Sequence, residues 1–162
     1  MNAVDRPGCS ERGAAALEFA IVAPVILLMI FGIIQYGYLY WSLQTASATA
    51  REAARQLIVG TREDCVTGQA VSQAGMPAVG AATPSMTRVY YDATGAPTPN
   101  RPVVGGLVTV TVSFQSLDMH LPLVPVPHDG VVTQSASARI ENIPPSPLLP
   151  DDPRYCTAPP SP

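Results

Sequence analysis

The sequence predicts an α+β fold with one long N-terminal helix, which spans a membrane with its first half and packs with its second half against a small antiparallel sheet of about three strands. Three observations lead to this prediction. They are an uncharged apolar run at residues 19–41, a helical stripe of apolar residues directly after it, and a later segment, residues 107–115, in which apolar and polar residues alternate. A short second helix and a proline-rich C-terminal tail complete the expected architecture.

The apolar run is long enough to cross a bilayer. Its 23 residues, Phe19 to Trp41, carry no charge, and only Gln35 has a polar amide side chain. As a helix they span about 35 Å, against a hydrocarbon core of about 30 Å. Pro24 lacks a backbone donor and is expected to bend this helix. The aromatic residues at the outer end are more typical of a belt at the lipid headgroups than of a ligand surface; they are Tyr36, Tyr38, Tyr40 and Trp41.

The helix is expected to continue far beyond the membrane, to about Gly60. After the apolar run, small and apolar residues recur at steps of three and four, which indicates a stripe that faces another element. These residues are Leu43, Ala46, Ala50, Ala53 and Leu57. A helix over residues 14–60 is about 70 Å long, so its second half has to stand outside the bilayer. There it can serve as the spine of a head domain, residues 61–143.

The head is predicted to combine one short helix with the sheet. A capping threonine and two acids within residues 61–64 predict a helix that runs to about Gly75. Three later segments have the composition of strands, at residues 86–92, 107–115 and 131–142. In the middle one, valine and phenylalanine alternate with threonine and serine, so that one apolar face can cover the helix stripe.

Two proline-rich segments lie within and after the head. The connection at residues 121–130, LPLVPVPHDG, holds three prolines without a backbone donor and is predicted to be an extended apolar flap rather than an interior strand. The last segment, residues 144–162, has eight prolines in nineteen residues and no core-forming period. An extended or disordered tail is expected there.

A motif stands at the N-terminal edge of the apolar run. Residues 1–12 are polar and lack periodicity, so disorder is expected, and this leader stops at Gly13. Five residues later come Glu18 and Phe19. A glycine followed by AAALEF resembles the processing site of type IV pilin-like precursors. With the one-pass helix behind it, the segment looks most like the TadE-like pseudopilins of the Tad (tight adherence) pilus.

The resemblance implies that a prepilin peptidase cuts between Gly13 and Ala14 and frees residues 1–13. It implies a minor structural or assembly subunit of a Tad-type pilus, which supports pilus biogenesis and surface adhesion. The length of the chain favours a minor component. The partners implied are other pilin and pseudopilin subunits, the inner-membrane assembly platform and the lipid bilayer. The chain would be a single-pass inner-membrane protein with its head outside the cytoplasm, able to enter a surface pilus.

Cleavage would give Glu18 a specific role. The new amine of Ala14 lies four residues from Glu18 on the same side of the helix, and both charges need partners in a low dielectric. In a packed filament, Glu18 of one subunit can neutralise the amine of its neighbour, so Glu18 and Phe19 are the expected assembly residues. Without cleavage, Glu18 is an acid at the membrane edge near a helix N-terminus, favoured by about 0.3–1 kcal/mol.

Cleavage after Gly13 would divide the three cysteines between the leader and the mature chain. Cys9 leaves with the leader, and Cys65 and Cys156 remain as an even pair, which suits an oxidising compartment. A disulfide between them would tie the proline-rich tail to the head. The alternative is two buried free thiols.

The sequence offers little for other function classes. A net charge of −3, with nine arginines that form no cluster, makes nucleic acid an unlikely partner. No catalytic constellation, phosphate loop or cofactor motif is present, since Gly105-Gly106 lacks the lysine and helix of a P-loop. His120 and His128, with Asp118 and Asp129 nearby, suggest a metal site, but their spacing matches no common ligand pattern.

Two alternatives to the pilin interpretation stay open. Ala46-Ser47-Ala48 has the form of a signal-peptidase site, so the apolar run could be a signal peptide that releases a soluble exported protein. The run is long for that purpose, and bulky aromatic residues precede the cut. The other alternative is a one-pass anchor that is never cleaved.

Overall fold

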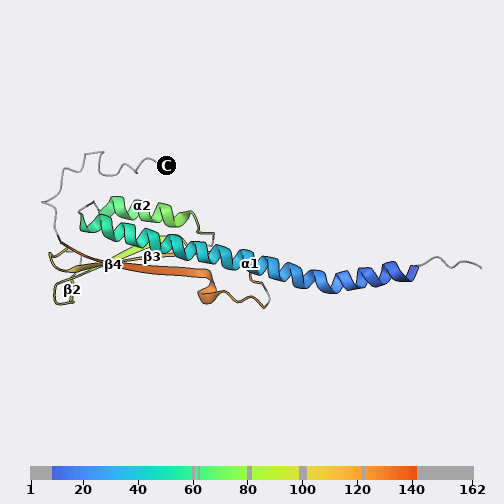
Figure 1. Cartoon of the computed structure of the whole chain (residues 1–162). Helices are drawn as coiled ribbons and strands as arrows, with labels where there is room; N and C mark the ends of the chain where they lie inside the picture. Colours follow the sequence, from blue (N-terminus) through green and yellow to red (C-terminus); the bar gives the residue numbers. More distant parts are fainter. Residues whose placement is uncertain are drawn as a thin grey trace, which may run out of the picture.

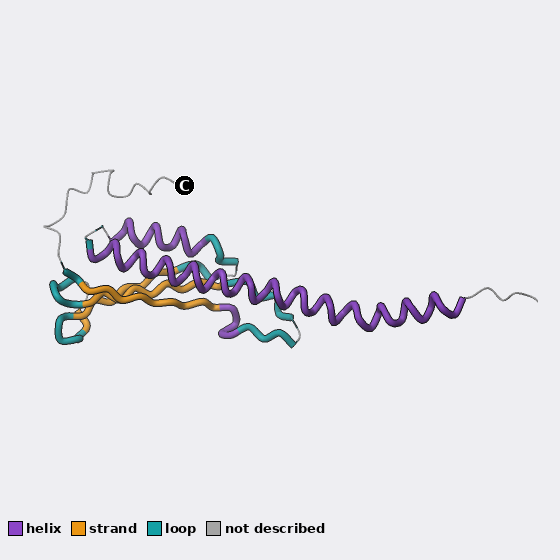
Figure 2. Tube along the Cα trace, in the orientation of Figure 1, coloured by secondary structure: helices purple, strands orange, loops and turns teal. Residues whose placement is uncertain are grey.

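The computed structural model describes residues 9–59, 61, 63–79, 82–98, 102–121 and 123–141. In it, the C-terminal half of a long helix and a second, shorter helix cover one face of an antiparallel sheet (Figures 1 and 2). The predicted α+β fold is confirmed. The elements in chain order are α1 (Cys9–Ile58), α2 (Glu63–Gly75), β1 (Ser85–Tyr91), β2 (Pro97–Thr98), β3 (Leu107–Gln115), the 3₁₀ helix η1 (Pro127–Gly130) and β4 (Val131–Arg139).

The sheet has the strand order β2-β1-β3-β4, and every neighbouring pair is antiparallel. The three predicted strands are present, although β4 ends at Arg139 and not at residue 142. The prediction of about three strands missed β2, which has only two residues and pairs with the end of β1. Its hairpin turn is closed by the Asp92 carboxylate, which accepts the backbone N–H groups of Thr94 and Ala96 at 2.8 and 2.9 Å.

The core lies between α1, α2 and the sheet. The alternation predicted for β3 is observed, because Val108, Val110, Val112 and Phe114 are buried and the residues between them are partly exposed. Opposite them α1 presents small side chains, among which Ala46 and Ala50 are fully buried. Alanines let the helix backbone approach the sheet closely, so the larger valine and phenylalanine side chains fill the space between the layers.

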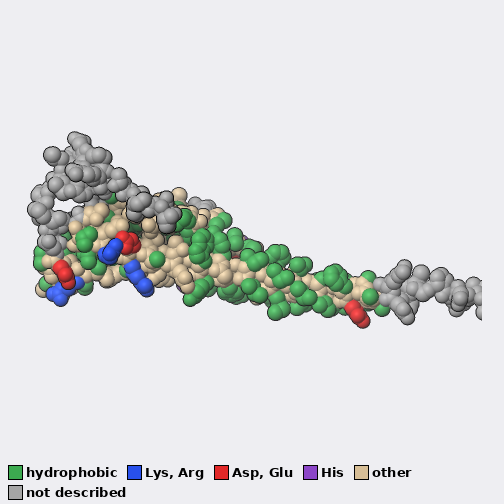
Figure 3. Space-filling model, turned by 45° about the horizontal axis from the view of Figure 1, so that its top comes forward, with side chains coloured by type: hydrophobic (Ala, Val, Ile, Leu, Met, Phe, Trp, Pro, Cys, Tyr) green, Lys and Arg blue, Asp and Glu red, His purple; other side chains and the backbone are tan. Residues whose placement is uncertain are grey.

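The N-terminal half of α1 extends beyond the head as a single helix with an apolar surface (Figure 3). Large apolar side chains are exposed along it, with Phe19 at 73% and Ile33 at 71%. Among the described residues, one helix segment, Gly13–Ile58, is long and apolar enough to cross a membrane. Figure 1 shows α1 changing direction in the blue, N-terminal third that contains Pro24, as expected for a residue without a backbone donor.

The start of α1 differs from the prediction. The helix begins at Cys9 and not at Ala14, so that the last residues of the expected leader are helical. The reason lies in the local sequence, since Gly13 is the only helix-weakening residue between Pro7-Gly8 and the strong helix formers Ala14, Ala15 and Ala16. A single glycine costs a helix only about 0.5–1 kcal/mol, which is too little to stop it here.

A polar clamp joins the start of α2 to β1. The Glu63 carboxylate accepts a hydrogen bond from the Tyr90 hydroxyl at 2.7 Å and pairs with the Arg88 guanidinium. Burial, and then the neighbouring Glu63 carboxylate, raise the pKa of Tyr90 far above its ordinary value. Tyr90 therefore stays a neutral donor, and the clamp fixes α2 over the sheet beside the α1 layer.

The flap, residues 121–130, runs back along α1 towards the apolar half of the helix (Figures 1 and 2). It contains no strand in its described residues, as predicted, and ends in η1. The Tyr36 hydroxyl donates to the Pro125 carbonyl oxygen at 2.8 Å, and a side chain at Gly32 would touch Val124 at 3.8 Å. Positive φ angles at non-glycine positions in the described chain are confined to this region, at His120, Leu123, His128 and Asp129.

We expect Ala46→Leu to lower the free energy of unfolding by about 1–3 kcal/mol, because the added atoms meet a closed helix–sheet contact. Ala48→Leu is the matched control, since Ala48 lies half a turn away on the exposed side of α1. Denaturant unfolding of the full chain in detergent micelles, followed by circular dichroism, gives both values. Equal stability of the two variants would contradict the packing described for α1.

Candidate functional site

The candidate processing and assembly segment, Gly13 to Phe19, lies in the first turns of α1 after the leader. Every residue of the segment is exposed, and nothing lies within 4 Å of the position that a side chain would take at Gly13. Ala14 and Glu18 are four residues apart in an unbroken helix, so they share one side of it. The structure therefore presents Gly13, Ala14, Glu18 and Phe19 together on a surface that the head leaves open.

The peptide bond after Gly13 is part of the helix in this structure. A peptidase that cuts there has to reach a backbone whose groups are engaged in helical hydrogen bonds. Glycine lowers the cost of local opening, because it loses more conformational freedom in a helix than any other residue. Gly13 is thus suited to a cleavage point by its missing side chain and also by the weakness that it introduces.

The two tyrosines that point from α1 to the head mark where the helix enters it. Besides the contact of Tyr36 with the flap, the Tyr38 hydroxyl donates to the Pro77 carbonyl oxygen at 3.1 Å. The Tyr38 ring packs edge-on against Trp41, with 5.3 Å between ring centroids. From the sequence, these aromatic residues were expected at the lipid headgroups. The two hydrogen bonds from their hydroxyls to the head were missed, because the partners are 39 and 89 residues apart in the chain and leave no local pattern.

One residue inside the apolar run is polar and hidden. Gln35 is fully buried, and neither polar atom of its amide has a hydrogen-bond partner within the described part of the chain. One helical turn further, Leu39 is also buried, and from Ser42 on the head covers the helix continuously along one side. The Ser42 and Ser116 hydroxyls are hydrogen-bonded at 2.8 Å beneath that cover. The contact between the head and α1 therefore begins within the apolar run and not after it.

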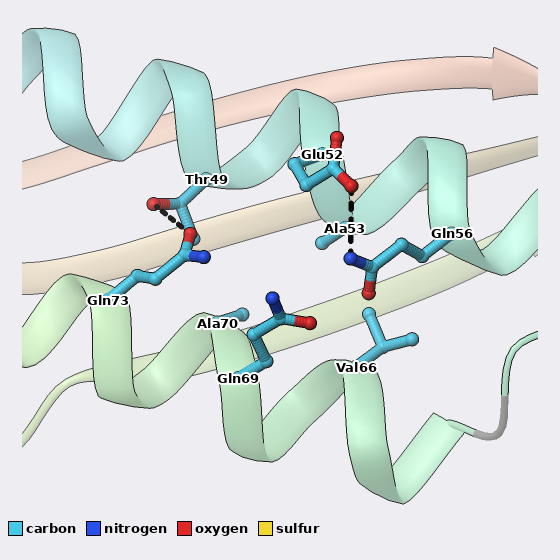
Figure 4. A pocket seen from close by; sticks show the side chains of 8 residues that line it. All are labelled: Thr49, Glu52, Ala53, Gln56, Val66, Gln69, Ala70 and Gln73. Carbon is cyan, nitrogen blue, oxygen red and sulfur yellow. Dashed lines mark hydrogen bonds between the residues drawn. The ribbon is translucent and has the colours of Figure 1, made fainter. Parts of the chain in front are cut away.

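A cleft between α1 and α2 is polar but too small for a ligand (Figure 4). Thr49 donates to Gln73 across it at 3.3 Å, and Gln56 donates to Glu52 at 3.0 Å. The hydrogen bonds from Arg55 and then Gln56 lower the pKa of Glu52. The enclosed volume is about 10 Å³, room for roughly one water molecule. This seam joins two helices and has no place for a cofactor.

A larger groove of about 360 Å³ lies between α1 and the start of β4. Leu39 and Leu43 line it from the helix, and Val132 and Gln134 from the strand. Among the described residues that line it, His128 is the one with a titratable side chain.

The histidines do not form a metal centre in the described part of the chain. His120 donates its backbone N–H to the Asp118 carboxylate at 2.8 Å, and its ring nitrogen lies 3.6 Å from the other oxygen of that carboxylate. His128 and Asp129 belong to η1. Among the described residues, no three side chains of the types that bind metals come together.

The predicted cysteine pair lies only partly within the described residues. Cys65 is in the first turns of α2, close to the polar clamp. Cys156 falls outside the described residues, as do Gly60 and the tail at 144–162. The disulfide therefore stays a prediction.

Comparison with known proteins identifies one family. The model of the family described as TadE-like protein matches residues 13–55. The match begins at Gly13 and covers the apolar run and most of the helix that packs on the sheet, and it ends before α2. No curated protein and no solved structure matches the chain. The resemblance seen at Gly13, Glu18 and Phe19 is confirmed for this segment of the chain.

Proposed function

We propose that this chain, TadE-like over residues 13–55, is a pilin-like minor structural or assembly subunit of a Tad-type pilus. One observation carries the proposal. The matched segment coincides with an exposed apolar helix that starts at the cleavage motif and continues without a break into the core of a head. A subunit of this shape can be held in a membrane by one half of α1 and transferred into a filament as one piece.

The proposed sequence of events begins with a prepilin peptidase. It hydrolyses the peptide bond between Gly13 and Ala14, which leaves a carboxylate on Gly13 and a free amine on Ala14. The amine then stands one turn from Glu18, and both lie on the open surface of α1. Since neither charge is favourable in lipid unless it is paired, Glu18 of one subunit and the amine of the next would attract each other as subunits pack.

The proposal includes the partners and the location of the chain. The exposed apolar half of α1 faces lipid before assembly and the corresponding helices of other pilin and pseudopilin subunits after it. The head stands outside the cytoplasm, and the platform in the inner membrane carries out the transfer. No catalytic step by this chain is part of the proposal.

The structure weighs against the signal-peptide alternative. A cut after Ala48 would remove the α1 residues that are buried against the head, among them Leu39, Ser42 and Ala46. The released domain would lose part of its helix layer and expose valines of β3 and β4. An uncleaved anchor would keep that helix layer. Only cleavage at Gly13 distinguishes the pilin proposal from an uncleaved anchor.

Replacement of Gly13 by Leu should block maturation, because the peptidase would meet a bulky side chain at the cut and a stronger helix. The product should be a membrane-bound precursor that retains residues 1–13, visible by its mobility and by N-terminal sequencing. Gly37→Leu is the control, since Gly37 also lies in α1 with open space around it. A Gly13 variant that matures to an Ala14 start would refute the assigned site, and a wild-type start at Thr49 or Met1 would favour the signal peptide or the plain anchor.

Replacement of Glu18 by Ala should leave insertion and cleavage intact and abolish incorporation into pili, because an uncompensated buried charge costs several kcal/mol at each contact. Glu18→Gln should fail nearly as badly, since it keeps the shape and loses the charge. Glu11→Gln is the control, because residue 11 leaves with the leader. The amount of protein in the membrane, its cleavage and the number of surface pili are measured in the same strains. Normal piliation in both Glu18 variants would refute the role proposed for Glu18.

We also propose a disulfide between Cys65 and Cys156. It would close a loop of about ninety residues and contribute on the order of 4 kcal/mol in the loop-entropy model. Mass spectrometry of the non-reduced protein should detect a linked peptide, and Cys9→Ser should leave it unchanged. Two free thiols in protein exposed to the oxidising compartment would exclude the bridge.

A further inference from the structure

The flap reaches the transmembrane part of α1. Its contacts with the helix are made at Gly32 and Tyr36, and both positions lie within the apolar run at residues 19–41. The neighbouring Gln35 is fully buried, so protein already covers one side of the helix at this level. The flap is therefore part of the head that extends past the outer end of the apolar run towards its middle.

The depth follows from the helix geometry. With Glu18 as the last charged residue before the run, Phe19 marks the inner edge of the hydrocarbon. Gly32 is then about 20 Å and Tyr36 about 26 Å along the helix, against a hydrocarbon thickness of about 30 Å. Both contact points of the flap fall inside the hydrocarbon, in the leaflet on the side of the head.

The chemistry of the flap suits this environment. Residues 121–127, LPLVPVP, carry no charge, and the apolar side chain of Leu123 is 90% exposed. Irregular backbone is costly in lipid because its polar groups lack partners. Three of these seven residues are prolines without an N–H, the Val124 N–H donates to the Leu121 carbonyl oxygen, and the Pro125 carbonyl oxygen accepts from Tyr36.

Polar residues frame the apolar stretch on both sides. His120, whose side chain is 84% exposed, precedes it, and His128 and Asp129 follow it. Polar flanks around an apolar tip are the arrangement expected of a loop that dips into a bilayer and returns to the headgroups. His120, Leu123 and His128 have positive φ angles, which are uncommon for residues other than glycine.

We propose that the flap inserts into the outer leaflet of the membrane that α1 crosses, so that Leu123 and Val124 are a second lipid contact of the head beside the transmembrane helix. The inference rests on the proposed membrane helix, because without it the bilayer would not lie at the level of Gly32. The proposed partner of the flap is lipid. The experiment below distinguishes lipid from a contact with the flap or the helix of a second copy.

The test measures depth by tryptophan fluorescence in vesicles of phosphatidylcholine and phosphatidylglycerol. Trp41, the only tryptophan, is first changed to Phe, which keeps a ring against Tyr38. The full chain then receives one tryptophan at Leu123, at Ile30 in the apolar run or at Val104 at the far end of the head. All three side chains are at least 46% exposed, so the new indole meets little protein. Phospholipids brominated at different acyl positions quench an indole according to its depth.

If the flap is inserted, Leu123→Trp is quenched by bromines within the acyl chains, because the adjacent Val124 meets α1 at Gly32, about 5 Å from the middle of the bilayer. Ile30→Trp is quenched by deep bromines and Val104→Trp by none. An unquenched Leu123→Trp beside a quenched Ile30→Trp overturns the flap insertion and leaves the membrane helix standing. An unquenched Ile30→Trp overturns the membrane helix itself. A Leu123→Trp emission that shifts to the blue only at high protein-to-lipid ratio, without quenching, overturns the inference in favour of contact with a second copy.

Discussion

The head has no closed core without the second half of α1. β3 and β4 bury their valines against one side of that helix, on which Ala46 and Ala50 are fully buried. The same backbone continues into a segment whose whole surface is apolar. One element therefore has two surroundings, and the change from an exposed apolar helix to a core helix happens along a single stretch of hydrogen-bonded backbone between Gly32 and Ser42.

This sharing explains the one-sided architecture. The helices cover one face of the sheet, and the other face is open, as antiparallel sheets allow. On the open face, hydroxyls pair directly across strands, with Thr109 and Ser137 at 2.8 Å and Ser113 and Thr133 at 3.0 Å. Such pairs satisfy each other's hydrogen bonds without charge and keep this part of the face polar, and Arg139 adds a positive charge at the end of β4.

Much of this arrangement could be predicted from local pattern. The period of two in β3 and the three-to-four spacing of small residues in α1 are strong signals, because each reflects a single buried face. The run from Gly13 to Phe19 has a fixed spacing, and the TadE-like family model matches from Gly13 onward. The start of α1 was misplaced because helix propensity at Ala14 outweighs one glycine. The clamp of Glu63 with Arg88 and Tyr90, the hydroxyl contacts of Tyr36 and Tyr38, and the two-residue β2 depend on long-range pairing or on very few residues. No periodic pattern in the sequence indicates these contacts or this strand.

The continuity of α1 also has a mechanical consequence. A head joined to its apolar segment by a linker could swivel, but here α1 continues as helix from the bend in its Pro24-containing part to Ile58, so the part of α1 after that bend and the sheet incline together. The flap lies along one flank of α1. If it enters the bilayer as proposed, an inclination of α1 towards the flap would carry it deeper and an inclination away would lift it out, so the sheet would have a preferred orientation relative to the plane of the membrane.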